Sequence, residues 1–228
     1  MLTDRQMHLK RFFDMSIALC VLILGWPLIL VLILIATIDT GSIGLFSQSR
    51  IGRFGRPFKL YKVRTMCRGQ EGPTVTHAGD VRVTPLGRVL RRWKLDELPQ
   101  FWNVLFGSLS LVGPRPDIAG FADQLQGLDR HILDVRPGIT AGASIRWRHE
   151  ETLLAAVPDP ITFNREIIWP DKVQCNLDYI RHWSLSGDIR LIMATLLPTI
   201  IHTRWQTMTL EHQEFFCSTH ETSRHTAK

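Results

Sequence analysis

Residues 15–38, "MSIALCVLILGWPLILVLILIATI", carry no charged side chain over 24 consecutive positions. About 20 consecutive apolar residues are enough for a helix to span the hydrocarbon core of a bilayer. The stretch therefore predicts a membrane segment near the N-terminus. A cleaved signal peptide fits less well, because the apolar run is long and lacks a small-residue cleavage pattern.

Pro27 lies in the middle of this stretch, directly after Gly25 and Trp26. Proline removes a backbone donor and clashes with the preceding turn, so we expect a bend there. Each arm would hold about 12 residues, or roughly 18 Å of helix, which is shorter than a bilayer core of about 30 Å. Composition alone leaves two alternatives, a kinked spanning helix and a re-entrant helix that enters and leaves through one leaflet.

Both flanks of the apolar stretch are basic, which favours the re-entrant alternative. The flanking cations are Arg5, Lys10 and Arg11 before it and Arg50, Arg53, Arg56, Lys59 and Lys62 after it. Positive residues prefer the cytoplasmic side, and a straight crossing would place one basic flank outside. At the start, "KRFFDM" is expected at the membrane interface, with Lys10 and Asp14 as i,i+4 neighbours and Phe12 and Phe13 at headgroup level.

The chain has 228 residues, enough for one ordinary domain with a substantial core. Its net charge is +6, and residues 50–94 hold twelve Lys/Arg against two acidic residues. Such a block indicates an anionic partner, whether nucleic acid, a phosphorylated metabolite or anionic lipid, although a solvated basic face fits it equally. The four cysteines are far apart, so a metal or disulfide framework is not expected, and nothing indicates an oxidising compartment.

Beyond residue 40 the sequence predicts short elements of both kinds. Residues 57–63, "PFKLYKV", are expected to form a strand after a glycine-marked turn. Two helices are predicted at 84–94, capped by Thr84 with Pro85 at the first position, and from Pro99 to Gly107. Residues 136–151 predict a turn followed by a strand, and residues 171–201 are mostly helical, with an apolar end too short to span a bilayer.

Two carboxylates, Asp96 and Glu97, fall between these two predicted helices and follow a run of cations. The N-terminus of the second helix would favour anions, because its free N–H groups carry partial positive charge. The pair is consistent with a solvated surface or with a site that binds an anionic substrate. Arg115, held between Pro114 and Pro116, suits phosphate or carboxylate binding, although an ordinary ion-paired arginine fits the same position.

Several segments in a fixed order resemble one family. They are "KRFFD" (10–14), the proline-broken apolar segment, "SQSRIGRFGRPFKLYKVRTM" (47–66), "RVTPLGRVLRRWKLDELPQFWNVLFGSLSLVGPRP" (82–116), "RPGITAGAS" (136–144) and "DYI" (178–180). Over roughly residues 8–200 the chain is similar to the bacterial sugar transferases that are monotopic phosphoglycosyl transferases. Two departures are Trp26, where the family often has serine, and "GITAGASIRWRHEE", where many relatives have "GITGxxQ".

The resemblance implies an activity. Members transfer a sugar-1-phosphate from a nucleotide diphosphate sugar, usually a UDP-sugar, to a polyprenyl phosphate such as undecaprenyl phosphate, and release UMP. They use Mg²⁺ and a phospho-aspartate intermediate, and they start glycan or exopolysaccharide assembly. The resemblance places the protein at the bacterial cytoplasmic membrane with its catalytic domain on the cytoplasmic face.

The resemblance also assigns roles residue by residue. Asp96 is expected to be the nucleophile, and Glu97 to place the metal or deprotonate the second substrate, both as metal ligands. The remaining candidates are Lys62, Arg91 and Arg115 for substrate phosphates, Arg146 and Arg148 for donor contacts on one face of the predicted strand, and Pro27 for the membrane break.

The expected fold is mainly α with a small β component (α+β). It combines a re-entrant membrane helix at residues 1–40 with a compact cytoplasmic catalytic domain at 41–205 that carries interfacial amphipathic helices, and a polar, mobile tail at 206–228. A membrane-anchored scaffold that binds lipid or a partner enzyme is the alternative from another class. A nucleic-acid binder is disfavoured, because the apolar segment is present and a recognition motif is not. The sugar, the glycan pathway and the oligomeric state, including a homodimer, stay open.

Overall fold

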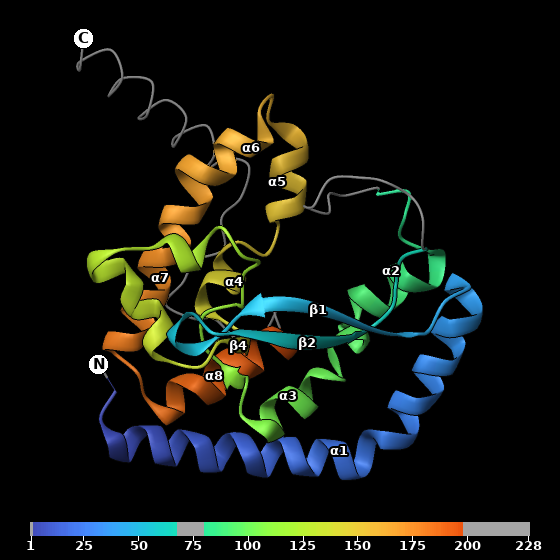
Figure 1. The fold of residues 1–228 in the computed structure, drawn as a ribbon, viewed down its shortest axis with the longest axis horizontal. Helices are drawn as coiled ribbons and strands as arrows, with labels where there is room; N and C mark the ends of the chain where they lie inside the picture. The colour runs from blue at the N-terminus through green and yellow to red at the C-terminus, as the bar shows by residue number, and fades with distance from the viewer. Residues whose placement is uncertain (1, 68–79, 198–228) are drawn as a thin grey trace.

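The computed structural model describes residues 2–67 and 80–197. The tail predicted at 206–228 lies outside the described residues. The described chain is mostly helical with two small two-stranded sheets, which confirms a mainly α fold with a minor β component (Figure 1).

The long helix α1 (Asp4–Thr40) contains the apolar stretch. It begins with a capping box between Thr3 and Gln6 and ends at Gly41, whose φ of 62° is the left-handed conformation that glycine tolerates. Figure 1 shows that α1 bends into two limbs. Pro27 is the proline inside this helix, and its missing N–H gives the bend a physical cause.

One face of α1 is buried along both limbs. The buried residues recur mostly every fourth position, as Lys10, Asp14, Ala18 and Leu22 on the first limb and Ile29, Leu32, Ala36 and Thr40 on the second. Residues 23–28, between the two sets, include the exposed Ile23, Leu24, Trp26 and Leu28. Among the described helices, α1 alone is long and apolar enough to cross a membrane by length and composition.

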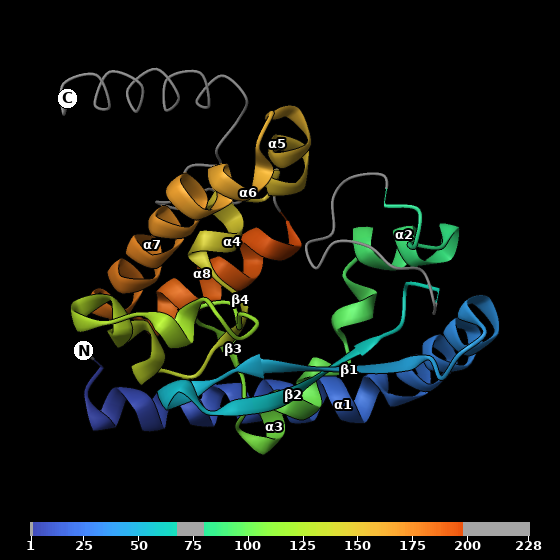
Figure 2. The same cartoon turned by 45° about the horizontal axis from the view of Figure 1, so that its top comes forward.

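The antiparallel hairpin of β1 (Leu45–Ile51) and β2 (Pro57–Val63) lies along α1, as Figure 2 shows. Its register pairs Leu45 with Val63 and Ile51 with Pro57. A short 3₁₀ turn, η1 (Arg53–Gly55), connects the strands, and Gly55 has a φ of 76°. The predicted strand and the glycine-marked turn before it are therefore confirmed.

The second sheet pairs β3 (Ser110–Val112) in parallel with β4 (Gly138–Thr140). Two glycines let these backbones approach closely, since a Cβ on Gly138 would lie 2.1 Å from the Gly113 nitrogen. Gly138 N donates to Pro114 O at 2.8 Å, and Gly113 N donates to Thr140 O at 3.0 Å. The segments "SLVGPRP" and "RPGIT" are thus joined backbone to backbone at the base of the Arg115 loop.

The two helices predicted around the acidic pair are both present. In α2 (Pro85–Arg92) the Thr84 hydroxyl accepts from Gly87 N, and α3 (Gln100–Phe106) ends at Gly107 with a φ of 87°. Between them lies a 3₁₀ turn, η2 (Leu95–Glu97). Because helix caps are local interactions, the sequence is sufficient to predict them.

The strand predicted within residues 136–151 is wrong beyond Thr140. The chain forms α4 (Gly142–Arg146) and α5 (Glu150–Ala156) instead. Small residues in "AGAS" have little preference for a pleated surface, and α4 buries Ala143 and Ile145. Arg146 and Arg148 therefore do not share a strand face.

The remaining elements complete the C-terminal half. They are η3 (Ala122–Gln124), η4 (Gly127–Asp134), α6 (Pro160–Phe163), the π-helical turn η5 (Asn164–Ile168), α7 (Trp169–Arg181) and α8 (Leu185–Leu196). α7 and α8 confirm the helical prediction up to residue 196. The main core brings together side chains from β3, η4, α7 and α8 with Ala18 of α1.

Candidate active site

The acidic pair is carried by η2, which packs against α2 and β2. Leu95 and Leu98, on either side of the pair, contact a cluster that includes Leu32 and Ala36 of α1. The packing of these two partly buried leucines fixes the orientation of the turn and thereby the positions of Asp96 and Glu97. The position of the pair is thereby linked to the apolar helix through this shared cluster.

Asn103 fixes α3 to strand β2. Its side-chain oxygen accepts from Tyr61 N at 3.1 Å, and its amide nitrogen donates to Lys59 O at 2.7 Å. The side chain is 4% exposed, so both hydrogen bonds are shielded from water. This contact places the helix that follows the acidic pair beside the strand that carries Lys62.

Glu97 is the centre of the charged cluster. Its Oε1 accepts from Lys62 Nζ at 3.1 Å and from Arg115 Nη2 at 2.8 Å. Its Oε2 is buried and, within the described part of the chain, has no hydrogen-bond partner. Three residues far apart in the sequence, all predicted for this site, therefore meet at one carboxylate.

Asp96 lies beside this cluster with a different environment. Asp96 is 6% exposed, and its carboxylate accepts no hydrogen bond from the described residues. Burial raises its pKa, against the attraction of Lys62. A buried carboxylate without hydrogen-bond donors is available to react with a bound group.

The pKa of Glu97 is displaced in the opposite direction. Burial pushes it upward, but Arg115, Lys62 and Lys94 outweigh burial and hold it well below its ordinary value. Neighbouring carboxyls whose pKa values are driven apart are typical of sites that divide roles between two acids.

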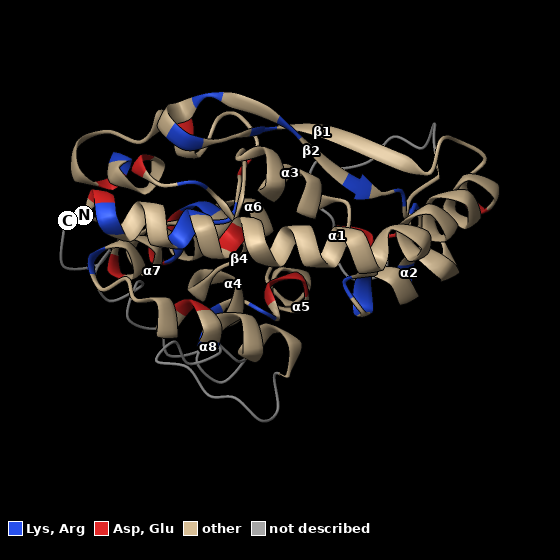
Figure 3. Ribbon diagram, turned by 90° about the horizontal axis from the view of Figure 1, so that it is seen from below, with Lys and Arg blue, Asp and Glu red and all other residues tan. Residues whose placement is uncertain are grey.

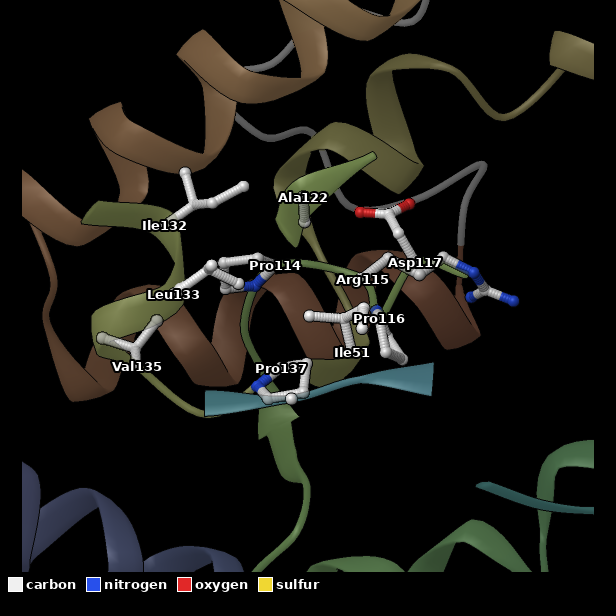
Figure 4. A pocket seen from close by; sticks show the side chains of 11 residues that line it. Ile51, Pro114, Arg115, Pro116, Asp117, Ala122, Ile132, Leu133, Val135 and Pro137 are labelled. Carbon is white, nitrogen blue, oxygen red and sulfur yellow. The ribbon is translucent and has the colours of Figure 1, made fainter. Parts of the chain in front are cut away.

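Arg115 stands on the proline-flanked loop after β3, and its side chain is 45% exposed although it binds Glu97. Behind the loop is a mainly apolar pocket, lined by Ile51, Pro114, Pro116, Ala122, Ile132, Leu133, Val135 and Pro137. Figure 4 shows the polar ends of Arg115 and Asp117 directed away from Leu133 and Val135. The apolar packing supports the loop while the guanidinium faces the acidic pair.

Arg91 is close to the pair through α2. Its Nε donates to Thr65 Oγ1 at 2.9 Å, and its charge is felt by the Asp96 carboxyl. The predicted phosphate contacts Lys62, Arg91 and Arg115 therefore all surround the acidic pair.

Arg146 and Arg148, the predicted donor contacts, are engaged elsewhere. Arg146 Nε binds Asp171 Oδ2 of α7 at 2.7 Å, and Arg148 Nη2 donates to Ala194 O of α8 at 2.9 Å. The salt bridge therefore holds Arg146 against α7, away from the acidic pair on η2. Arg148 nevertheless lies near the site, since its positive charge repels the Lys94 ammonium.

The "KRFFD" residues are not arranged as an interfacial pair. Lys10 and Asp14 are buried, and they face the globular body rather than lipid headgroups. Lys10 binds Asp188 of α8, and Asp14 Oδ1 accepts from Leu111 N of β3. Phe12 is 72% exposed, whereas Phe13 packs against the core. The segment therefore docks α1 onto the body.

Some residues of the site were not singled out from the sequence. Asn103 and Lys94 lie within the quoted motifs and Asp117 directly follows one of them, but their contacts depend on segments distant in the chain. Burial raises the pKa of Asp117 to about 6, against the attraction of Lys172 and Arg50. The signal available for Asp117 was its position two residues after Arg115, the arginine expected to bind phosphate.

The donor set also bears on a metal ion. The described residues contain no group of three or more His, Cys, Asp or Glu side chains that could hold one. Two adjacent carboxylates are present, and Glu97 Oε2 is buried without a partner. Mg²⁺ is typically bound by one or two carboxylates together with substrate phosphates and waters, so these residues fit it.

Comparison with known proteins gives a consistent set of relatives. Residues 5–202 match the family model described as "Bacterial sugar transferase". The chain is 36% identical over 200 residues to the UDP-glucose:undecaprenyl-phosphate glucose-1-phosphate transferase of Escherichia coli, covering 85% of this chain and 40% of that protein. It is 33% identical over 195 residues to the uncharacterized sugar transferase EpsL of Bacillus subtilis, covering 86% and 89%.

A third relative has a different stated sugar. The UDP-N-acetylgalactosamine-undecaprenyl-phosphate N-acetylgalactosaminephosphotransferase of Aeromonas hydrophila is 34% identical over 195 residues, covering 82% of this chain and 43% of that protein. The chain thus spans less than half the length of two of these relatives and most of the third. Their names differ in the sugar and agree on undecaprenyl phosphate where they state an acceptor.

Proposed function

Because the chain belongs to the bacterial sugar transferase family, we propose that it transfers a sugar-1-phosphate from a UDP-sugar to a polyprenyl phosphate such as undecaprenyl phosphate. The observation that carries this proposal is the arrangement around Glu97. Lys62 and Arg115 hold its carboxylate from one side, while the neighbouring Asp96 carboxylate is buried and free of hydrogen bonds from the described residues.

The reaction proceeds in two displacements. An Asp96 carboxylate oxygen attacks the phosphorus that bears the sugar, a P–O bond to Asp96 forms, and the bond to the departing UMP breaks. A phosphate oxygen of the polyprenyl phosphate then attacks the same phosphorus, which forms the lipid-linked diphosphosugar and regenerates Asp96. Splitting the transfer in this way means that the two bulky substrates need not be bound together.

The cations reduce the electrostatic repulsion between the attacking carboxylate and the diphosphate. A diphosphate resists attack by a carboxylate, and Lys62, Arg91 and Arg115 reduce this repulsion and stabilise charge that develops at phosphorus. Bound Mg²⁺, held by Asp96 and Glu97, would supply further neutralisation of phosphate charge.

The opposite pKa displacements divide the work of the two carboxyls. Glu97, whose pKa lies well below its ordinary value because Arg115, Lys62 and Lys94 outweigh the effect of burial, is a weak proton acceptor. It therefore serves as a permanently charged anchor for the cations and the metal, in preference to deprotonating the second substrate. Asp96, poorly solvated and without hydrogen-bond donors from the described residues, is suited to attack.

The proposed membrane arrangement is re-entrant. Both limbs of α1 bury one face against a single globular body, whereas a straight crossing would separate one limb from these partners. Residues 23–28, around Pro27, are mostly exposed and apolar, as expected for the part that enters deepest into lipid. Figure 3 shows α1 crossing this face with α3 on one side and α8 on the other.

Exposed apolar side chains of these neighbouring elements extend the membrane face. They are Trp102 and Phe106 of α3 and Ile189, Met193 and Leu196 of α8. A polyprenyl phosphate can keep its tail in lipid while its phosphate reaches the basic site above. The catalytic body would then lie on the cytoplasmic face.

Two experiments test these proposals. Wild-type protein incubated with a UDP-sugar labelled in the sugar-bearing phosphate should become labelled at Asp96, and Asp96→Asn should abolish both labelling and UMP release. Asp129→Asn, which removes a carboxyl on η4 outside the site, should behave as wild type. Full activity in Asp96→Asn would contradict the mechanism. For the topology, an N-terminal tag accessible only from outside, with residue 60 cytoplasmic, would exclude the re-entrant arrangement.

A further inference from the structure

Lys94 has an unusual backbone conformation directly before the acidic turn. Its φ of 55° and ψ of 23° are left-handed, which among the described residues only Lys94 and Phe54 adopt without being glycine. A Cβ disfavours this region, and glycine or asparagine normally occupies it. Such outliers persist where the surrounding structure requires them, and they cluster at functional sites.

The backbone of Lys94 fixes its position relative to the carboxylates. Lys94 N donates to Arg91 O at 3.1 Å, and Glu97 N donates to Lys94 O at 3.2 Å. The residue therefore forms the corner between α2 and η2. Its side chain leaves this corner exposed to solvent, two positions before Asp96.

The ammonium of Lys94 differs from the other cations of the site in having no hydrogen-bond or salt-bridge partner among the described residues. Lys62 and Arg115 bind Glu97, Arg91 binds Thr65, and Arg148 binds Ala194 O. Arg115 and Arg148 lie close enough to repel this ammonium, and Glu97 and Asp96 lie close enough to attract it. An additional anion at this position would relieve the repulsion among these cations.

We propose that Lys94 is a further substrate-phosphate contact of this site, an inference that rests on the proposed function. A lysine ammonium offers three donors on a flexible stem and binds phosphate as a point charge. The corner position places the residue two positions before Asp96, and its ammonium forms no hydrogen bond or salt bridge with the described residues. The phosphate is a group of the donor diphosphate or the phosphate of the polyprenyl acceptor, since both must reach Asp96.

The left-handed corner makes a clean test possible. Lys94→Gly and Lys94→Asn both suit the backbone conformation and remove the ammonium, while Lys94→Arg keeps a cation. Arg92→Ala, two positions earlier on an exposed part of α2, is the matched control for loss of one positive charge. The melting temperature of Lys94→Gly should not fall below that of the wild type, which separates loss of binding from loss of fold.

The measurements use the full chain in detergent. UDP affinity is measured by calorimetry, and the KM for undecaprenyl phosphate is measured with a UDP-sugar that the wild type turns over. Loss of a hydrogen-bonded charge contact should weaken one of the two by about ten- to a hundredfold in Lys94→Gly and Lys94→Asn. In Lys94→Arg both values should stay within about threefold of those of the wild type. In Arg92→Ala both values should equal those of the wild type.

The two arms identify the phosphate and separate the two proposals. Weaker UDP binding with an unchanged acceptor KM assigns Lys94 to the donor, and the reverse assigns it to the acceptor. Wild-type values for both in Lys94→Gly and Lys94→Asn would overturn the inference and leave the proposed function standing. A wild type that releases no UMP from any UDP-sugar would contradict the proposed function and this inference with it.

Discussion

Lys10 Nζ lies 2.6 Å from Asp188 Oδ2, and the two side chains are only 9% and 1% exposed. Tyr179 OH and Trp183 Nε1 also donate to the Asp188 carboxylate, at 2.8 Å and 3.0 Å. The buried charge of Asp188 is therefore satisfied by a cation from α1 and by two donors at the C-terminal end of α7 and just after it. This network holds the first limb of α1 on the α7–α8 unit.

Removing Lys10 should lower the free energy of unfolding, because the buried Asp188 carboxylate loses its cation. Lys10→Met keeps the volume of the side chain but leaves Asp188 without its cation, and we expect a loss of about 3–5 kcal/mol in the free energy of unfolding. Chemical unfolding in detergent measures this loss. The double variant Lys10→Met/Asp188→Asn should lose clearly less than the sum of the single variants, and strict additivity would contradict a direct coupling.

The same ion pair shows what the sequence could not predict. Lys10 and Asp14 are spaced for an ion pair within the helix, and that spacing equally places them on one buried face. The choice depends on Asp188 and Leu111, which lie far along the chain. The caps at Thr84 and Gly107, in contrast, were predicted correctly because their hydrogen bonds are local.

The same distinction between local signals and long-range contacts applies to the residues of the site. Asp96, Glu97, Lys62 and Arg115 were expected from the family resemblance, and the fold joins the last three at one carboxylate. The periodicity around Arg146 was misread, because small residues fit a short helix or a strand until packing against α7 decides between them. The left-handed conformation of Lys94 has no sequence signal, since lysine rarely adopts it.

Asn103 should be a positioning residue for the whole cluster. Asn103→Ala removes the partners of Tyr61 N and Lys59 O, and we expect it to cost about 1–3 kcal/mol of stability and to lower UMP release. Asn103→Asp keeps the shape and the acceptor but loses the donor, so it should also be destabilised. Melting temperature and UMP release measure the two effects, and unchanged values in both variants would contradict the role.

Arg115 should control the ionisation of Glu97. Burial pushes the Glu97 pKa upward, and Arg115 is the strongest of the charges that hold it below its ordinary value. A depressed carboxyl pKa contributes stability above the unfolded pKa of 4.5 that is lost as the pH falls through the folded value. In Arg115→Met the folded pKa rises, so this contribution shrinks.

The difference in melting temperature between wild type and Arg115→Met should therefore be largest at neutral pH, and it should narrow as the pH falls through the raised Glu97 pKa of the folded variant. Arg92→Met, which removes an arginine that does not bind Glu97, should show no such narrowing. A difference that stays constant down to the lowest pH at which both proteins remain folded would contradict control of Glu97 by Arg115.

Asp117 should have the opposite pH dependence. Burial raises its pKa from 3.8 to about 6, against the attraction of Lys172 and Arg50. The folded state then binds more protons than the unfolded state between these values, so the contribution of this group to stability falls as the pH rises through that window. Above this window Asp117 is a half-buried, poorly solvated carboxylate, and its ionisation lowers the stability of the folded state.

Asp117→Asn removes this cost while keeping the shape of the side chain. At pH 7.5 the variant should be more stable than the wild type by up to about 3 kcal/mol, and each kcal/mol corresponds to about 2–4 °C in melting temperature. Near pH 4 the two proteins should melt together, because Asp117 is then largely protonated in the folded state. Asp129→Asn controls for general loss of a carboxyl. A gain that is the same at pH 4 and pH 7.5 would show that the stabilisation comes from the amide and not from the ionisation of Asp117.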